Sequence, residues 1–98
     1  MDALEHLMGA YFHQDWDLDG GKVSDTVSAF LRERRDVVAR CAVQIDELLG
    51  ADLPEGALQA KLTGWGSDYY AGDTDDDYRA WLDDVRKQIR ASLASAAS

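Results

Sequence analysis

Apolar residues recur at helical spacing along most of this chain, and this pattern limits the folds open to it. The clearest stripe lies near the C-terminus, where apolar side chains three or four positions apart hold one face for about four helical turns. Its members are Tyr78, Trp81, Leu82, Val85, Ile89 and Leu93. The alternation of apolar and polar residues that is typical of a half-buried strand does not occur. The spacing therefore predicts an all-α chain.

Four more helices follow from the same spacing. Their apolar residues lie within 4–12, 23–31, 38–49 and 57–62. Charged residues around Glu33 separate the second of these stripes from the third. We therefore expect a break or kink near Glu33, with one long helix that has a solvated middle as the alternative.

The length of the chain decides how these helices are organised. A chain of 98 residues without a linker or an internal repeat suits one domain, since domains cluster near about 100–150 residues. We therefore expect residues 1–98 to form a small single-domain bundle of about five helices joined by short loops. Whether the stripes are buried within one chain or between copies, as in a homo-oligomer, stays open.

Several side chains are suited to the beginnings of helices. Asp2 precedes the first stripe and can cap it. Thr74 and Asp77 resemble a capping box, with Asp in place of the usual Glu. Asp75 and Asp76 suit the positive end of the last helix dipole.

The charge of the chain is strongly negative. It has 19 acidic and 10 basic residues, a formal charge of −9. Nucleic acids and anionic membranes attract the opposite sign, so we expect neither as a partner. The excess lies in two segments, residues 1–25 with six acids and one Lys, and residues 65–84 with seven acids and one Arg. A basic protein is the natural complement.

Both acidic segments also carry aromatic residues, and aromatic rings beside carboxylates are typical of protein interfaces. We expect Tyr11 and Trp81 to lie in the core because they occupy stripe positions. Since Tyr69 and Tyr70 are adjacent in a loop, one of them should be exposed. The residues predicted to bind a partner are Asp17, Asp19, Asp68, Tyr69, Tyr70, Asp73, Asp75, Asp76 and Asp77.

One motif resembles a metal site. Asp15, Asp17 and Asp19, followed by Gly20, match the beginning of an EF-hand calcium loop. The twelfth loop position, where a bidentate Glu closes the coordination sphere, is Thr26. A divalent-cation-binding helical module is therefore an alternative function, whereas turn-capping aspartates explain the motif without a metal.

Candidates for other chemistry are few. His6 and His13 have no third histidine to complete a zinc site. Cys41, the single cysteine, occupies a core position, which predicts a raised thiol pKa and excludes an intrachain disulfide. No serine forms a nucleophile elbow. We therefore expect no enzymatic activity, no cofactor and no metal.

The N-terminus lacks the basic and apolar regions of a signal peptide. No stretch approaches the roughly 18 apolar residues of a membrane span. We therefore expect a soluble, cytoplasmic protein.

The run Tyr11-Phe12-His13-Gln14-Asp15-Trp16, within Leu4 to Gly20, resembles the N-terminal signature of a family of bacterial immunity proteins. These proteins belong to contact-dependent growth inhibition (CDI) systems. Further points of likeness are Ile45-Asp46, Leu48-Leu49, Leu58, Leu62 and Trp81-Leu82, so the resemblance covers nearly the whole chain.

The resemblance implies an all-helical cytoplasmic protein without catalysis or cofactor. Such a protein binds and neutralises the C-terminal toxin domain of a cognate effector of the CdiA type. These toxins are frequently nucleases, whose basic surfaces an acidic protector complements. The resemblance also implies that the run from Tyr11 to Trp16 is scaffold, with Trp16 folded onto the bundle. A generic helical protein-interaction domain stays the other alternative.

Overall fold

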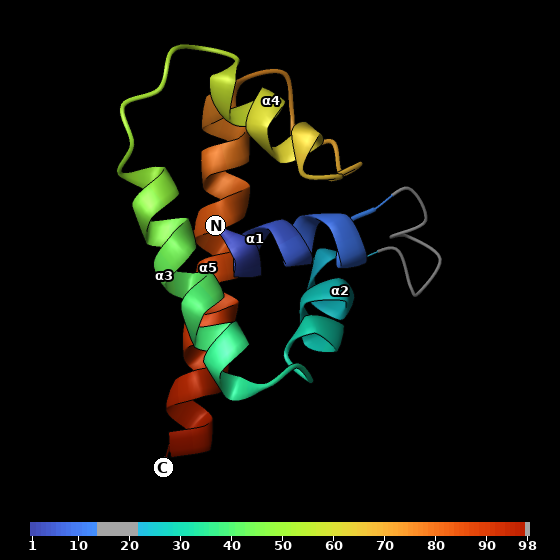
Figure 1. Cartoon of the computed structure of the whole chain (residues 1–98), viewed down its shortest axis with the longest axis vertical. Coiled ribbons are helices and arrows are strands. Elements are labelled where there is room, and N and C mark those ends of the chain that lie inside the picture. Colours follow the sequence, from blue (N-terminus) through green and yellow to red (C-terminus); the bar gives the residue numbers. More distant parts are fainter. Residues whose placement is uncertain (14–21, 98) are drawn as a thin grey trace.

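The computed structural model describes residues 1–13 and 22–97, and all regular secondary structure within these residues is helical (Figure 1). The α-helices are α1 (Asp2–His6), α2 (Val23–Phe30), α3 (Arg35–Leu49), α4 (Ala57–Gly64) and α5 (Asp75–Ala97). A π-helical segment, η1 (Leu7–Tyr11), continues α1. The predicted all-α bundle of about five helices is confirmed.

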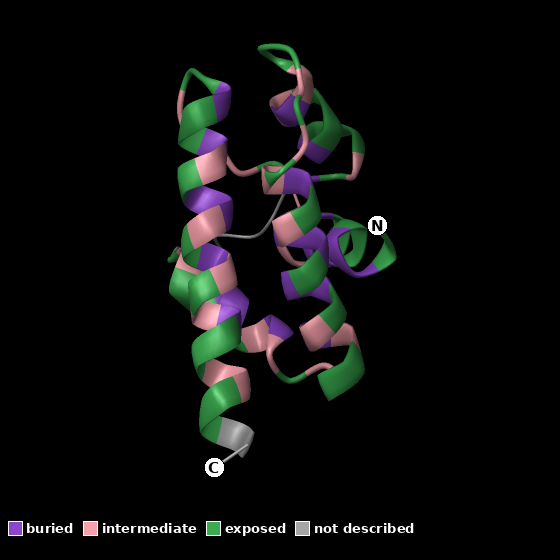
Figure 2. Ribbon diagram, turned by 90° about the vertical axis from the view of Figure 1, so that its left-hand side faces the viewer, coloured by how far each residue is buried: buried purple, intermediate pink, exposed green. Residues whose placement is uncertain are grey.

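Helices α3 and α5 form the long axis of the molecule, side by side and antiparallel (Figures 1 and 2). Helix α1 and η1 run across this pair, and α2 packs against both η1 and α5. Helix α4 packs against α5 near its N-terminal end. Among the helices described, none has both the length and the apolar character that a membrane span requires.

The predicted stripes meet in one core inside this chain. Buried positions on α5 and α3 follow the helical repeat (Figure 2). Each large apolar side chain buried in this way contributes about 1.5–3 kcal/mol of transfer free energy. The largest fully buried side chains are Phe12, Phe30, Leu4, Leu7, Met8, Ile45, Leu58, Leu62, Leu82, Ile89, Val27 and Val85.

The predicted break near Glu33 is confirmed, since α2 ends at Phe30 and α3 begins at Arg35. The Tyr11 hydroxyl donates a hydrogen bond to the Glu33 carboxylate, and His6 Nε2 lies 3.3 Å from it. The bond from Tyr11, followed by that from His6, lowers the pKa of Glu33. Burial, together with this carboxylate, raises the pKa of Tyr11 to about 12. The linker between α2 and α3 is thereby tied to α1 and η1.

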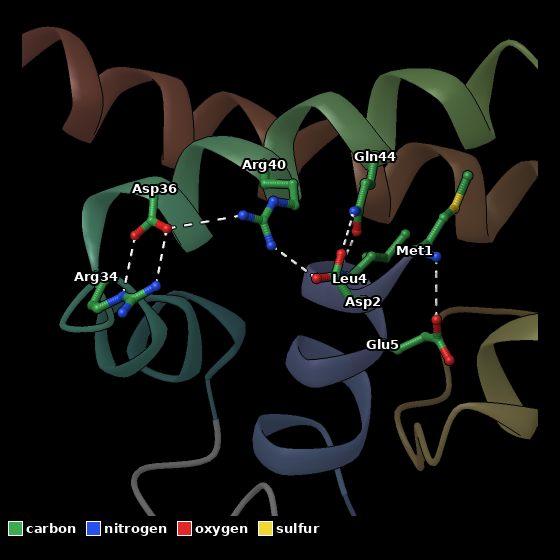
Figure 3. A network of polar contacts seen from close by, with 8 residues as sticks. All are labelled: Met1, Asp2, Leu4, Glu5, Arg34, Asp36, Arg40 and Gln44. Atoms are coloured by element: carbon green, nitrogen blue, oxygen red, sulfur yellow. Dashed lines mark hydrogen bonds and ion pairs between the residues drawn. The ribbon is translucent and has the colours of Figure 1, made fainter.

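The expected role of Asp2 as a cap is wrong, because α1 has no side-chain cap. Gln44 of α3 supplies the missing acceptor, and its Oε1 receives a 2.9 Å hydrogen bond from the backbone N–H of Leu4 (Figure 3). The Asp2 carboxylate accepts bonds of 2.8 Å from both Gln44 and Arg40. A backbone N–H group near the start of α1 is therefore satisfied by a side chain of α3. The sequence around α1 does not reveal this partner.

Candidate functional site

The two acidic segments meet where the N-terminal helix ends. Phe12 directly follows η1, and its carbonyl accepts a 2.7 Å hydrogen bond from the backbone N–H of Asp68. Asp68 lies in the loop between α4 and α5. This loop of the second acidic segment is therefore held against the end of residues 1–13, the first described part of the chain.

Two glycines make this approach sterically possible. A Cβ atom on Gly9 would lie 2.9 Å from the carbonyl oxygen of Trp65, and one on Gly66 would lie 3.0 Å from the Cα atom of Gly9. Gly66 also has φ +102°, in the left-handed region that favours glycine. Segment η1 and the end of α4 can touch because neither glycine carries a side chain.

An aromatic cluster supports the loop from the core side. Trp81 is buried, as predicted, and its ring centroid lies 5.0 Å from that of Phe12 in a T-shaped arrangement. The ring of Tyr69 lies 4.5 Å from Trp81 and 5.9 Å from Phe12. Tyr78 is edge-on to Trp81 at 6.2 Å. Since aromatic pairs add about 0.5–1.5 kcal/mol beyond area burial, this cluster stabilises the packing of the loop against the core.

The adjacent tyrosines differ in exposure, as predicted. Tyr69 is half-buried in the aromatic cluster, whereas Tyr70 is 65% exposed. The Tyr70 hydroxyl donates a hydrogen bond to the Asp73 carboxylate, and this bond raises the pKa of Tyr70. Tyr70 is thus an exposed ring whose outer end is held beside a negative charge.

A hollow of about 240 Å³ lies between the end of α4, the following loop and the first turn of α5. The structure brings three of the predicted binding residues, Asp68, Tyr69 and Tyr70, to its wall. The other three residues of the wall were not predicted from the sequence. They lie at a helix end, in a turn and on a core stripe, and nothing in the sequence indicates that these positions line one cavity. These are Thr63, Ser67 and Tyr78.

Asp75 does not belong to an exposed surface, and in this respect the prediction for it is wrong. The residue is 1% exposed, and its carboxylate accepts hydrogen bonds from the backbone N–H groups of Gly56, Leu58 and Gln59 at 2.9–3.3 Å. These groups lie at the beginning of α4, where N–H groups have no partner inside the helix. Asp75 therefore caps α4 from α5 and has a structural role.

The neighbours of Asp75 face outward. The predicted capping box is confirmed, since the Asp77 carboxylate accepts a 3.2 Å bond from the backbone N–H of Thr74 and the Thr74 hydroxyl accepts a 3.4 Å bond in return. Asp76 is exposed and forms a 2.7 Å ion pair with Arg79. The exposed predicted residues of this region, Asp68, Tyr70, Asp73, Asp76 and Asp77, are called the acidic surface below.

Several basic residues outside this region are paired with acids. Arg86 bonds Asp46 of α3 at 2.5 Å and also contacts Asp83, and the bond to Asp46, followed by that to Asp83, raises the pKa of Arg86. Lys87 lies 3.1 Å from Asp83, and Arg90 pairs with Asp46. In Figure 3, Arg34 and Arg40 are similarly paired with Asp36 and Asp2.

By contrast, residues 51–80 hold seven acids and two bases, a difference of −5. One of these bases, Arg79, is paired with Asp76, and the other, Lys61, lies 5.9 Å over the ring of Trp65. Helix α4 and the loops on either side of it lie at one end of the molecule (Figure 1). This end of the molecule therefore carries a net negative charge.

Only part of the scaffold run, residues 11–13, lies within the described residues. Phe12 is buried, and Tyr11 and His13 are half-buried. The remaining predicted residues of this run and of the EF-hand-like motif lie outside the described residues. They are Gln14, Asp15, Trp16, Asp17 and Asp19.

Other chemistry is sparse in what the structure describes. Within residues 1–13 and 22–97, no group of three His, Cys, Asp or Glu could hold a metal ion. Cys41 is buried in the core, and burial raises the pKa of its thiol to about 12, as expected. A thiol that stays protonated at neutral pH is a poor nucleophile.

Comparisons with known proteins give a consistent result. The model of the CdiI immunity protein family matches residues 1–89. A chain in the crystal structure of a CdiA-CT/CdiI complex from Y. kristensenii 33638 superposes with a TM-score of 0.77 and 27% sequence identity, and the match covers 90% of this chain and 96% of that one. No curated protein matches.

Proposed function

Since this chain belongs to the CdiI immunity protein family, we propose that it neutralises its cognate CdiA C-terminal toxin domain by binding it through the acidic surface. The carrying observation is the convergence of exposed carboxylates and an exposed aromatic ring on the loop between α4 and α5 and on the first turn of α5. Such a surface suits a cationic partner, because complementary charge steers association and a fixed ring supplies contact area.

The toxin in this proposal is a nuclease. An enzyme that acts on nucleic acid needs a basic surface for the phosphates, and an acidic protein can occupy that surface. Four carboxylates of the acidic surface supply the negative charge, those of Asp68, Asp73, Asp76 and Asp77. We further propose that the chain acts in the cytoplasm by binding alone and is not itself an enzyme.

Titration of the full chain with an inactive form of the CdiA C-terminal domain encoded beside it tests the proposal. We expect tight one-to-one binding, with an association rate that falls as salt rises because the Debye length shortens. A variant with Asp73→Asn, Asp76→Asn and Asp77→Asn should associate more slowly and lose much of this salt dependence.

The matched control neutralises three carboxylates elsewhere, with Asp25→Asn, Glu47→Gln and Asp84→Asn. It changes the net charge equally but leaves the acidic surface intact. If the two triple variants associate equally slowly, the acidic surface is not the binding face. Absence of binding by the unmodified chain at low salt rules out this toxin as its partner.

A further inference from the structure

We propose that the hollow between α4 and α5 receives an arginine side chain of the bound toxin domain. This inference rests on the proposed function and specifies the chemistry of one contact within it. The contact would be a guanidinium stacked on tyrosine and paired with the carboxylate of Asp68.

The size of the hollow favours a single side chain. Its volume is about 240 Å³, below the range of roughly 300–1,000 Å³ that is usual for small-molecule sites. Its wall combines three tyrosines with the polar side chains of Thr63, Ser67 and Asp68. A long, narrow and partly planar group suits this lining better than a bulky ligand does.

The composition of the wall favours a guanidinium. Arginine stacks its planar group on aromatic faces and pairs with carboxylates in bidentate geometry, whereas the ammonium of lysine is a compact point charge. Asp68 is exposed, and among the described residues no cation forms an ion pair with it. Its carboxylate is therefore available to a partner's cation.

The wall is held in place before any partner arrives. The backbone N–H of Ser67 donates a 3.1 Å bond to the carbonyl of Leu62, and that of Asp68 donates to Phe12 at 2.7 Å. The hydroxyl of Tyr70 is held by its bond to Asp73. A site fixed in this way loses little conformational entropy on binding, so its contacts count more fully toward affinity.

The first test compares Asp68→Asn and Tyr70→Ala with Asp52→Asn, each titrated with the inactive CdiA C-terminal domain at one fixed salt concentration. Asp52 is an exposed acid that does not line the hollow, so its variant controls for the loss of one charge. We expect Kd to rise about 10-fold or more for Asp68→Asn and about 5-fold for Tyr70→Ala, but less than about 2-fold for Asp52→Asn. Thermal unfolding confirms that each variant is folded.

The second test identifies the occupant. Each arginine and each lysine of the toxin domain is changed to alanine in turn. The effect of each change on Kd is measured with the unmodified chain and with Asp68→Asn, which completes a double-mutant cycle. We expect one arginine to show about 5-fold or greater coupling to Asp68.

If the unmodified chain binds tightly but no arginine is coupled to Asp68, the inference fails while the proposed function stands. Coupling to a lysine instead would overturn the assignment to arginine. If the unmodified chain does not bind the toxin domain at all, both proposals fail.

Discussion

The backbone N–H of Asp68 donates a 2.7 Å hydrogen bond to the carbonyl of Phe12, and this bond joins the N-terminal signature run to the acidic loop. Phe12 is buried, whereas Asp68 is exposed. A core residue of the scaffold therefore positions a residue of the proposed binding surface. Because this bond joins two backbone groups, it does not depend on the identity of either side chain.

Loss of the buried cap on α4 should destabilise the whole fold. The carboxylate of Asp75 satisfies three backbone N–H groups that have no other acceptor nearby in the helix. We expect Asp75→Ala to lower the free energy of unfolding by about 2 kcal/mol or more, measured by urea denaturation. Asp76→Asn, at the exposed neighbour, should leave the urea midpoint unchanged. Equal midpoints for Asp75→Ala and the unmodified chain would contradict the capping role.

The contact between the two glycines should not tolerate a side chain. A Cβ atom added to Gly66 would meet the backbone of Gly9. The substituted residue would also have to keep a positive φ, which is unfavourable for a residue with a side chain. We expect Gly66→Ala to lower the free energy of unfolding by about 1–3 kcal/mol. Gly64→Ala is the matched control, since that residue is helical and has nothing within 4 Å of an added Cβ. The control should be neutral or stabilising by up to about 1 kcal/mol in the same chemical denaturation experiment.

The network that joins α1 to α3 should depend on one uncharged side chain. Gln44 is 9% exposed and satisfies the N–H of Leu4 in addition to bonding Asp2 (Figure 3). We expect Gln44→Ala to lower the free energy of unfolding by about 1–3 kcal/mol, because it leaves a buried N–H without an acceptor. Arg40→Ala removes an exposed ion pair with Asp2 and should have no resolvable effect on thermal unfolding. A larger loss of stability for Arg40→Ala than for Gln44→Ala would contradict this prediction. It would show that the ion pair contributes more to stability than the hydrogen bond to the N–H of Leu4.

Stability should fall at alkaline pH because of Cys41. Burial raises the pKa of this thiol from 9.0 to about 12, so above pH 9 the unfolded chain releases a proton that the native chain retains. The unfolded state then binds fewer protons, and this thiol lowers the free energy of unfolding by up to about 1.4 kcal/mol per pH unit. Urea denaturation from pH 8 to 10.5 measures the slope.

Cys41→Ala is the control for this prediction, and it should show a shallower slope. Tyr11 also has a raised pKa, about 12, and contributes in the same direction above its ordinary value. Identical slopes for the unmodified chain and Cys41→Ala would exclude the thiol as a source. In the native state at pH 8, Cys41 should react with a thiol reagent only on unfolding.

The helices could be predicted closely from the sequence because each carries its own periodicity. The break between α2 and α3 could be predicted from the charged residues near Glu33. The capping box could be predicted because Thr74 and Asp77 lie three positions apart. The hollow could not be predicted in this way. Its wall combines Thr63 at the end of α4 with Tyr78 on α5, and the packing that brings them together involves contacts distant in sequence.

By itself, the sequence determined what depends on neighbouring residues, namely the helices, their apolar faces and the overall negative charge. Only the tertiary structure decided which charges face solvent. Asp75 and Asp76 are adjacent and chemically identical, yet one is buried beneath α4 and the other is exposed. The physical reason is that a carboxylate can be buried only where another element supplies hydrogen-bond donors, and here those donors are the N–H groups at the beginning of α4.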